Sequence, residues 1–370
     1  MVFNRLAAGP GGIDLAGGYP QLGTPPFLRD LLFDEFVRPG AADEPYGVSA
    51  LRAAIADDFA VRQGVLVDPV ENVTVTGSAS EAVTAAVLTL ARRGSAVVFF
   101  SPHFPVYSIA VAAAGAIPLF AAVALDGTFD VDGFGDLVAA GDVSAVILNS
   151  PHNPTGAVLS EIECVRLVEM CARRRIPVIS DEVFAHLIPG ISPAAVVDRN
   201  YPVVVVSDSG KKFDLRGFRL GWTIAGKELT RRIRIIQQIM TYRIPVPLQK
   251  TVIAGLRWAS DHHYDGLRIT LAANASILAD AMPGAARPYQ GGCFLLASVP
   301  GLTGTALSTR LAHRAEVHTL PATAFTEGRG PTAPDDFVRL SLARETSLIR
   351  EAAARLAAVS GAGRSDRSSP

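Results

Sequence analysis

The sequence predicts an α/β fold in which a mostly parallel sheet is covered by helices on both faces. Three observations lead to this prediction. Strand-like and helix-like segments alternate through the middle of the chain, the strand-like segments are continuous apolar runs, and 49% of the 370 residues are hydrophobic. A chain of this length and composition can bury the core of one large domain or of two, which excludes a disordered chain.

The predicted elements follow one another in a regular order. Apolar or β-branched runs predict strands at 72–76, 96–100, 117–123, 145–148, 177–180, 203–206 and 222–225. Helix-like segments lie between several of them, at 81–90, 106–114 and 161–173. From about residue 250 onward the pattern changes to long helices with two short strands, near 292–297 and 337–342.

The ends of the chain predict a second, smaller α/β domain built from both termini. Residues 1–45 are rich in glycine and proline, carry few helix signals, and are expected to border the opening of the site. We expect residues 46–250 to form the large domain and residues 251–360 to complete the small one. The final stretch, residues 361–370, has the composition of a disordered tail.

Net charge and cysteine content indicate which binding partners and which cellular compartment to expect. The net charge is −1, so no overall field recruits nucleic acid or an anionic membrane. The uncharged run Phe104–Leu125 is interrupted by Pro105, Gly115 and Pro118, which favours helix, turn and strand over a membrane span. The three cysteines form no disulfide framework and no signal peptide is recognisable, so we expect a cytoplasmic protein.

Several common cofactor and metal motifs are missing from the sequence. No G-x-G-x-x-G pattern follows a strand. Gly210-Lys211 lacks the earlier glycine of a P-loop, because Val205 stands at that position. His262 and His263 are adjacent, with no pattern of metal ligands around them. The sequence therefore predicts no dinucleotide, P-loop or metal site.

Lysine is rare, with 4 Lys against 30 Arg, and Lys211 stands in an unusual place. It follows the predicted strand 203–206 in a Ser/Gly-rich turn, where a partly desolvated amine can attack a carbonyl group. Arg219, eight residues further on and near two glycines, suits a phosphate. Taken alone, this segment is equally consistent with a solvated basic loop.

Residues at the ends of other predicted strands favour the chemical interpretation. Asp181 follows the strand at 177–180, Asn153 the strand at 145–148, and Phe104 the strand at 96–100. Ser78, Ala79 and Ser80 lie between a strand and a helix, where free backbone amides bind phosphate. In an open α/β sheet these carboxyl ends share one crevice. An amine, a carboxylate, an amide, an aromatic ring and a phosphate cradle together are the set needed to hold pyridoxal phosphate.

With these residues in this order, the chain resembles a known family, the class I/II aminotransferases, over roughly residues 13–355. Any one of its motifs is weak, but their order and spacing together are highly specific. The motifs are Gly17-Gly18-Tyr19-Pro20, Tyr46-Gly47 with Leu51-Arg52, Ser78–Ala82, Pro102-x-Phe104-x-x-Tyr107, Asn149–Gly156, Ser180–Phe184, Lys211–Trp222, Gly291-Gly292-x-Phe294 and Arg339-Leu340-Ser341.

The resemblance implies the fold-type I architecture of pyridoxal-phosphate enzymes, with a mostly parallel seven-stranded sheet between helices and a smaller α/β domain. It implies that Lys211 forms a Schiff base with pyridoxal 5'-phosphate and later shuttles a proton. Asp181 would pair with the ring nitrogen of the cofactor and Asn153 with its phenolic oxygen. Phe104 would stack on the face of the ring.

The resemblance also assigns residues to the phosphate and the substrate. Tyr46 would reach the phosphate from the second subunit of a homodimer, although a simple turn aromatic explains it equally well. Arg339 would grip the substrate α-carboxylate, with Asn153 beside it and Gly18 lining the opening; a surface ion pair is the alternative for Arg339. The other phosphate ligands would be Arg219, Ser80 and the backbone amides of Ser78 and Ala79.

Two positions depart from the family pattern. Phe184 stands where many of these enzymes carry a tyrosine that bonds the phenolic oxygen of the cofactor. Asp208 occupies the usual position of a phosphate-binding serine. Because a carboxylate would repel a phosphate, we expect Ser207 or Ser209 to serve instead.

The leading hypothesis is therefore an aminotransferase that moves an amino group from an L-amino acid to a 2-oxo acid. The two departures leave an alternative open, an oxidase, lyase or cyclase of a natural-product pathway with the same fold and cofactor. A non-catalytic regulator is disfavoured by the presence of Lys211 and by the lack of room for a DNA-binding domain before residue 13. The scarcity of charge in residues 17–27 indicates an apolar or small substrate.

Overall fold

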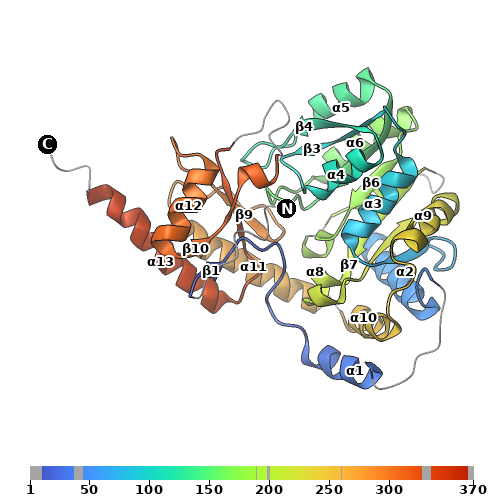
Figure 1. Ribbon diagram of the computed structural model, residues 1–370, viewed down its shortest axis with the longest axis horizontal. Coiled ribbons are helices and arrows are strands. Elements are labelled where there is room, and N and C mark those ends of the chain that lie inside the picture. Colours follow the sequence, from blue (N-terminus) through green and yellow to red (C-terminus); the bar gives the residue numbers. More distant parts are fainter. Residues whose placement is uncertain are drawn as a thin grey trace.

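The computed structural model describes residues 11–36, 45–188, 190–197, 201–259, 261–326 and 335–365. These residues form a larger body around a seven-stranded sheet and a smaller body that contains both ends of the described chain (Figure 1). The larger body lies at the right of the view and the smaller one at the left.

The central sheet confirms the predicted architecture. Its order is β2 (Val73–Thr76), β8 (Gly221–Ala225), β7 (Val203–Asp208), β6 (Val178–Asp181), β5 (Val143–Asn149), β3 (Ala96–Ser101) and β4 (Ile117–Ala122). The strands from β7 to β4 run parallel to one another, whereas β8 is antiparallel to both β7 and β2. The carboxyl ends of β5, β6 and β7 therefore lie at one edge.

Helices cover both faces of this sheet. One face packs against α3 (Ala79–Leu90), α4 (Val106–Ala113) and α9 (Lys227–Met240), and the other against α2 (Ser49–Gln63), α5 (Val131–Ala140), α6 (Glu161–Arg173) and α10 (Val246–Trp258). Neighbouring residues of β5 illustrate the arrangement, since Ile147 joins the first core and Val146 the second. Burial on both faces explains why the strands are continuous apolar runs.

The smaller body joins segments from both ends of the chain, as expected. Here β1 (Ile13–Asp14) pairs with β10 (Val317–His318), and β12 (Val338–Ser341) lies between β11 (Leu320–Pro321) and β9 (Phe294–Ala297). Strands β1, β9, β10 and β12 share an apolar core with α11 (Asp261–Ala281), α12 (Gly304–Ala315) and α13 (Thr346–Ser365). Helix α13 enters the stretch expected to be a tail, and residues 366–370 lie outside the described residues. The exact domain boundaries stay a prediction.

One helix was not expected. Within residues 1–45, where the sequence shows few helix signals, α1 spans Pro26–Phe36. Proline is favourable as the first residue of a helix, and α1 packs against α10, whose residues belong to the large core. Long-range packing therefore stabilises a helix that the local sequence does not predict.

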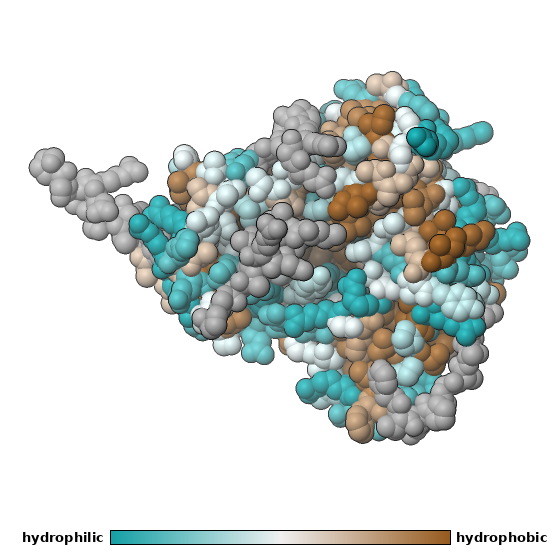
Figure 2. All heavy atoms as spheres, in the orientation of Figure 1, coloured by the Kyte–Doolittle hydropathy of each residue, from teal (hydrophilic) through white to brown (hydrophobic). Residues whose placement is uncertain are grey.

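The surface carries apolar side chains on one side of the large body. Figure 2 shows brown, apolar side chains gathered over the part of the molecule that carries α3, α4 and α9. Exposed large apolar residues on these helices include Leu88, Ile109, Ile235 and Ile239. In the described part of the chain, no helix combines the length and apolar character that a bilayer crossing needs.

Candidate active site

The ends of three neighbouring strands bring the central polar residues together. Asn149 and Asp181 end β5 and β6 and lie side by side in register. Lys211 follows β7 within the short helix α8 (Ser209–Phe213). The Asn149 amide donates a hydrogen bond to the Asp181 carbonyl at 3.0 Å, and its oxygen accepts from the backbone N–H of Asn153 at 2.8 Å. Asn149 thus connects Asp181 to the turn that carries Asn153.

Asp181 is a buried carboxylate with two hydrogen-bond donors. The Tyr107 hydroxyl donates to its Oδ2 at 2.6 Å, and the backbone N–H of Val183 donates to Oδ1 at 3.3 Å. Burial raises the pKa of Asp181 to about 6, against the opposing effects of these donors and of the charge of Lys211. Within the described residues no basic side chain is hydrogen-bonded to it. A cationic group of a ligand would therefore be a favourable partner for this carboxylate.

The amine of Lys211 lies near two aromatic rings. Its Nζ is 4.5 Å from the centre of the Tyr19 ring and 5.9 Å from that of Phe184. Asp208 caps α8, because its Oδ1 accepts the backbone N–H of Lys211 at 2.9 Å. The neighbouring Lys212 lies in a different environment, buried with its Nζ 3.5 Å from Asp58.

A polar pocket beside Lys211 has the features of an anion site. It is lined by Tyr19, Ser78, Asp208, Gly210, Lys211, Leu215, Arg216, Arg219 and Leu220. Ser78 is the N-cap of α3, so the first free N–H groups of a twelve-residue helix lie next to this wall. A Cβ on Gly221 would lie 2.5 Å from the Ser78 carbonyl carbon, so the strand can approach this closely only as glycine. Arg219 holds a left-handed backbone with φ of 49°.

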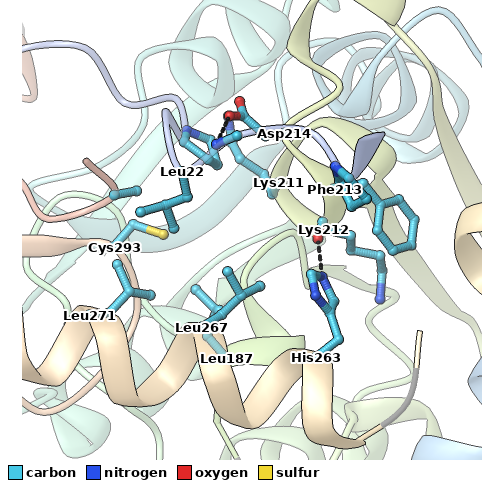
Figure 3. A pocket seen from close by; sticks show the side chains of 14 residues that line it. Leu22, Leu187, Lys211, Lys212, Phe213, Asp214, His263, Leu267, Leu271 and Cys293 are labelled. Carbon is cyan, nitrogen blue, oxygen red and sulfur yellow. Dashed lines mark hydrogen bonds between the residues drawn. The ribbon is translucent and has the colours of Figure 1, made fainter. Parts of the chain in front are cut away.

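A second pocket lies on the side of α11. Figure 3 shows Leu267 and Leu271 rising from this helix toward Leu22 and Cys293, with Lys211 and Lys212 above. His263 contacts the Lys212 carbonyl oxygen at 3.0 Å, which ties α11 to the turn that carries Lys211. The wall beyond Lys211 is therefore mainly apolar.

Arg339 is a buried guanidinium near Asn153. Its Nη1 donates to Asn153 Oδ1 at 2.9 Å and its Nη2 to the Ala16 carbonyl at 2.7 Å, while its Nε has no hydrogen-bond partner in the part of the chain that the structure describes. The Phe294 and Phe325 rings lie 4.1 and 4.7 Å from it. Burial, assisted by the charge of Arg344, lowers the pKa of Arg339 to about 9. A carboxylate would supply the missing counter-charge.

Comparison with known proteins identifies this arrangement. Residues 43–356 match the family model described as aminotransferase class I and II. A probable N-succinyldiaminopimelate aminotransferase of Mycobacterium tuberculosis and a methionine aminotransferase of Escherichia coli are each 30% identical, over 96% of this chain and 94% of theirs. The solved structure of the former superimposes with a TM-score of 0.89, at 30% identity and 97% coverage of both chains. That of the latter gives 0.86, at 28% identity and 96% and 95% coverage.

The chain belongs to the class I and II aminotransferases. It is an enzyme that transfers amino groups with the help of pyridoxal 5'-phosphate. The residues present fit this cofactor. Asp181 is a buried carboxyl group with no basic side chain hydrogen-bonded to it among the described residues, Lys211 lines both pockets with its amine, and the polar pocket joins Arg219 to a helix N-terminus.

The structure brings most of the predicted site residues of the aminotransferase together. Ala79 and Ser80 form the first turn of α3, directly after Ser78. The Phe104 ring lies edge-on to Tyr107, with centres 5.8 Å apart. A Cβ on Gly18 would lie 3.2 Å from Arg339 Nη2, so this glycine lies against the guanidinium.

Three predicted residues do not line either of these pockets. Asp208 lines the polar pocket, whereas Ser207 is buried with its hydroxyl unpartnered and the Ser209 hydroxyl donates to the Leu220 carbonyl at 3.1 Å. The Tyr46 ring packs 3.8 Å from the guanidinium of Arg234. Roles for Ser207, Ser209 and Tyr46 at the phosphate stay predictions.

Sequence reasoning gave no role to four residues that border the site. Tyr107 belongs to one of the family motifs, and its position three residues after Phe104, about one helical turn, is a signal that the two side chains lie close together. Asn149 begins another quoted motif. Tyr19 and Arg344 acquire their positions only through contacts between the two ends of the chain.

Proposed function

We propose that this aminotransferase accepts L-amino acids with uncharged side chains and passes their amino group to a 2-oxo acid. The observation that carries the proposal is the buried guanidinium of Arg339, which has no carboxylate partner among the described side chains and lies beside Asn153. An α-carboxylate is common to the donor and the acceptor. Arg339 would hold it in both halves of the reaction.

The positions of the residues at the strand ends support the proposed cofactor contacts. When bound, pyridoxal phosphate supplies electron withdrawal that weakens the Cα–H bond of the attached amino acid. Asp181 would hold the ring nitrogen and the Asn153 amide group the phenolic oxygen, while Phe104 covers the ring. Lys211 would bind the cofactor covalently, and its Nζ would then carry the proton that leaves Cα.

The phosphate would lie in the polar pocket. The backbone amides of Ser78, Ala79 and Ser80 are available at the start of α3, and Arg219 would add a charge-assisted hydrogen bond. Asp208 shares this wall and would oppose the negative charge of the phosphate.

The surroundings of Lys211 support a neutral side chain on the donor. No charged residue occurs between Gly17 and Phe27, the segment that passes over Arg339, and the wall toward α11 carries Leu22, Leu267 and Leu271. One of the relatives at 30% identity is a methionine aminotransferase. We therefore propose methionine and similar apolar amino acids as donors.

We further propose that the enzyme is a cytoplasmic homodimer. Homodimers are typical of this family, and the exposed apolar residues of α9, Ile235 and Ile239, support an interface on that side. The cysteines Cys164, Cys171 and Cys293 are free, as is usual in a reducing compartment. Sedimentation equilibrium tests the assembly, and a fully active monomer would contradict it.

The decisive experiment is a half-reaction. Protein loaded with pyridoxal phosphate is mixed anaerobically with single amino acids and no acceptor, and the cofactor is analysed by chromatography. We expect stoichiometric pyridoxamine phosphate from methionine and leucine, none from glutamate or lysine, and recovery on addition of a 2-oxo acid. Lys211→Ala should abolish conversion, whereas Lys227→Ala, at an exposed surface lysine, should not. Product formed without pyridoxamine phosphate would contradict the proposal.

A further inference from the structure

The segment Asp14–Tyr19, here called the strap, passes over two residues of the site. The Ala16 carbonyl accepts a hydrogen bond from Arg339, and the Tyr19 ring lies on the amine of Lys211. Only the first residue of the strap, Asp14, belongs to a strand, β1, and the next residue, Leu15, has backbone hydrogen bonds to His318 and Ser341. Regular sheet pairing therefore does not hold residues 16–19 in place. Other contacts must set the path of the strap.

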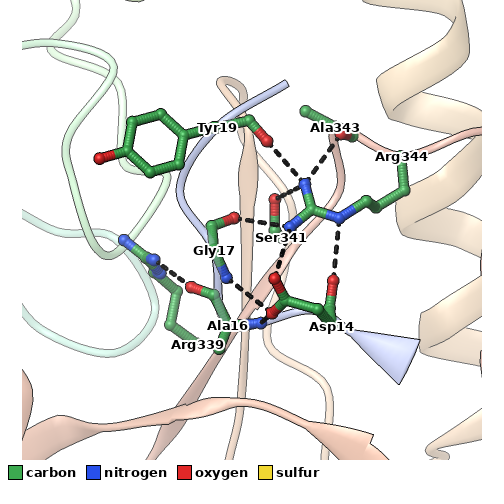
Figure 4. A network of polar contacts seen from close by, with 8 residues as sticks. All are labelled: Asp14, Ala16, Gly17, Tyr19, Arg339, Ser341, Ala343 and Arg344. Carbon is green, nitrogen blue, oxygen red and sulfur yellow. Dashed lines mark hydrogen bonds and ion pairs between the residues drawn. The ribbon is translucent and has the colours of Figure 1, made fainter. Parts of the chain in front are cut away.

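Three of these contacts come from one side chain, Arg344. Figure 4 shows its guanidinium surrounded by strap carbonyls: Nε donates to Asp14 at 2.9 Å, Nη2 to Gly17 at 2.9 Å and Nη1 to Tyr19 at 2.6 Å. Nη1 also contacts the Ser341 hydroxyl at 3.1 Å. Arg344 is fully buried, so these carbonyl oxygens take the place of its water.

The strap is shaped to receive this guanidinium. The Asp14 carboxylate accepts the backbone N–H groups of Ala16 and Gly17, and its other oxygen lies 3.8 Å from Arg344 Nη2. A Cβ on Gly17 would lie 3.0 Å from the same nitrogen, so a side chain there would displace it. A planar guanidinium with five N–H donors can bridge three carbonyls, which a lysine ammonium cannot do with the same geometry.

Tyr19 ends the strap and contacts Lys211. Its carbonyl is fixed by Arg344, while its ring, 46% exposed, lies with its centre 4.5 Å from Lys211 Nζ. The electron-rich face of an aromatic ring attracts an ammonium group at this distance. The Phe184 ring is farther from the amine, with its centre at 5.9 Å.

We propose that Arg344 and Tyr19 are positioning residues for Lys211: Arg344 sets the path of the strap, and the Tyr19 ring holds the Lys211 amine whenever it is not bonded to the cofactor. This inference rests on the proposed role of Lys211. It gives a function to the buried guanidinium of Arg344, which has no part in the proposed binding of substrate by Arg339.

The test measures the Lys211 amine directly in cofactor-free protein. The protein is treated with an amine-acetylating reagent, and the rates of labelling at Lys211 and at exposed Lys227 are followed by mass spectrometry. Tyr19→Leu removes the ring face and should speed labelling of Lys211 about two- to fivefold, whereas Tyr19→Phe should leave the rate unchanged. Arg344→Met should resemble Tyr19→Leu, and the double variant should be no faster than either single variant.

The labelling rates test the positioning roles of Tyr19 and Arg344 separately from the proposed aminotransferase function. Equal labelling of Lys211 in wild type and Tyr19→Leu would overturn the role of the ring. Additive effects of the two substitutions would overturn the connection through the strap. Because loss of a buried arginine can impair folding, Arg344→Lys serves as a second variant, and it should give an intermediate rate. The anaerobic half-reaction of the wild type tests the aminotransferase proposal independently of these variants.

Discussion

The hydroxyl of Tyr107, on α4, donates a 2.6 Å hydrogen bond to Oδ2 of Asp181, at the end of β6, with both side chains buried. The bond stabilises a carboxylate whose pKa burial raises. It also leaves the carboxylate as the acceptor, since burial and the adjacent charge of Asp181 raise the pKa of Tyr107 far above its usual value. A helix on one face of the sheet thus orients the residue proposed to hold the ring of the cofactor.

Tyr107→Phe removes this donor without changing the shape of the ring. We expect the pKa of Asp181 to rise and affinity for pyridoxal phosphate to fall about tenfold, because a hydrogen bond to a charged group contributes about 1.5 kcal/mol. Titration of cofactor-free protein, followed by fluorescence quenching, gives the affinity. Tyr201→Phe, which removes a hydrogen bond to the Ile176 carbonyl near the start of β6, is the control. Equal affinities of the two variants would contradict the prediction.

Asp181→Asn should change how the stability of cofactor-free protein depends on pH. The pKa of Asp181 is raised by burial from 3.8 to about 6, so its contribution to stability is full below pH 4 and is lost as pH rises through 6. Asparagine does not titrate. The variant should therefore gain on the order of 2–3 kcal/mol relative to wild type between pH 4 and pH 7. Urea unfolding at several pH values measures this difference, and parallel pH profiles would disprove it.

Arg339→Lys should weaken the binding of substrate carboxylates while cofactor affinity is retained. Lysine keeps the charge but loses the planar pair of N–H donors, and we expect the dissociation constant for the amino donor to rise about 10²-fold, or roughly 3 kcal/mol for a charge-assisted pair. Saturation of the half-reaction rate gives this constant. Arg243→Lys, at the end of the turn after α9, is a matched control. An unchanged dissociation constant would remove Arg339 from the substrate site.

Asp208→Ser should tighten the binding of pyridoxal phosphate. The carboxylate lines the same pocket as Ser78 and Arg219, and two like charges repel. Serine still caps α8, so the Lys211 turn should keep its shape. We expect an affinity gain of about threefold to tenfold that shrinks at high salt. Asp126→Ser, at an exposed turn, should show no gain, and weaker binding by Asp208→Ser would show that the carboxylate assists the cofactor.

Asp58→Asn should strongly destabilise the fold. Asp58 faces Lys212 at 3.5 Å and Arg62 at 2.8 Å; burial would raise its pKa, but these two charges outweigh it and lower the pKa. Replacing the Asp58 carboxylate leaves the charge of Lys212 buried without its nearest counter-charge, which should lower the free energy of unfolding by about 3–5 kcal/mol. The exposed pair of Arg92 and Asp142 gives the matched variant Asp142→Asn, which should cost less than about 1 kcal/mol. Similar urea-unfolding energies for the two variants would refute this.

Much of the fold and part of the site follow from local sequence. Continuous apolar runs are sufficient to predict β5, β6 and β7, because strands buried on both faces leave no polar alternation. Asp181 and Lys211 stand just beyond two of these runs, so the parallel arrangement brings them to one edge. Helix α1 was missed, since its packing on α10 rather than its composition stabilises it.

The tertiary structure alone decided how these residues are held. Arg339 is 186 positions from Asn153, and Arg344 is 325 positions from Tyr19, so no local pattern links either pair. At the end of β7, Asp208 lines the polar pocket, whereas the neighbouring Ser207 and Ser209 do not. A sequence determines which segments are apolar and which groups can react. Which distant carbonyl or carboxylate a buried guanidinium meets depends on how the completed core brings the chain ends together, because most buried donors are paired with an acceptor in a folded core.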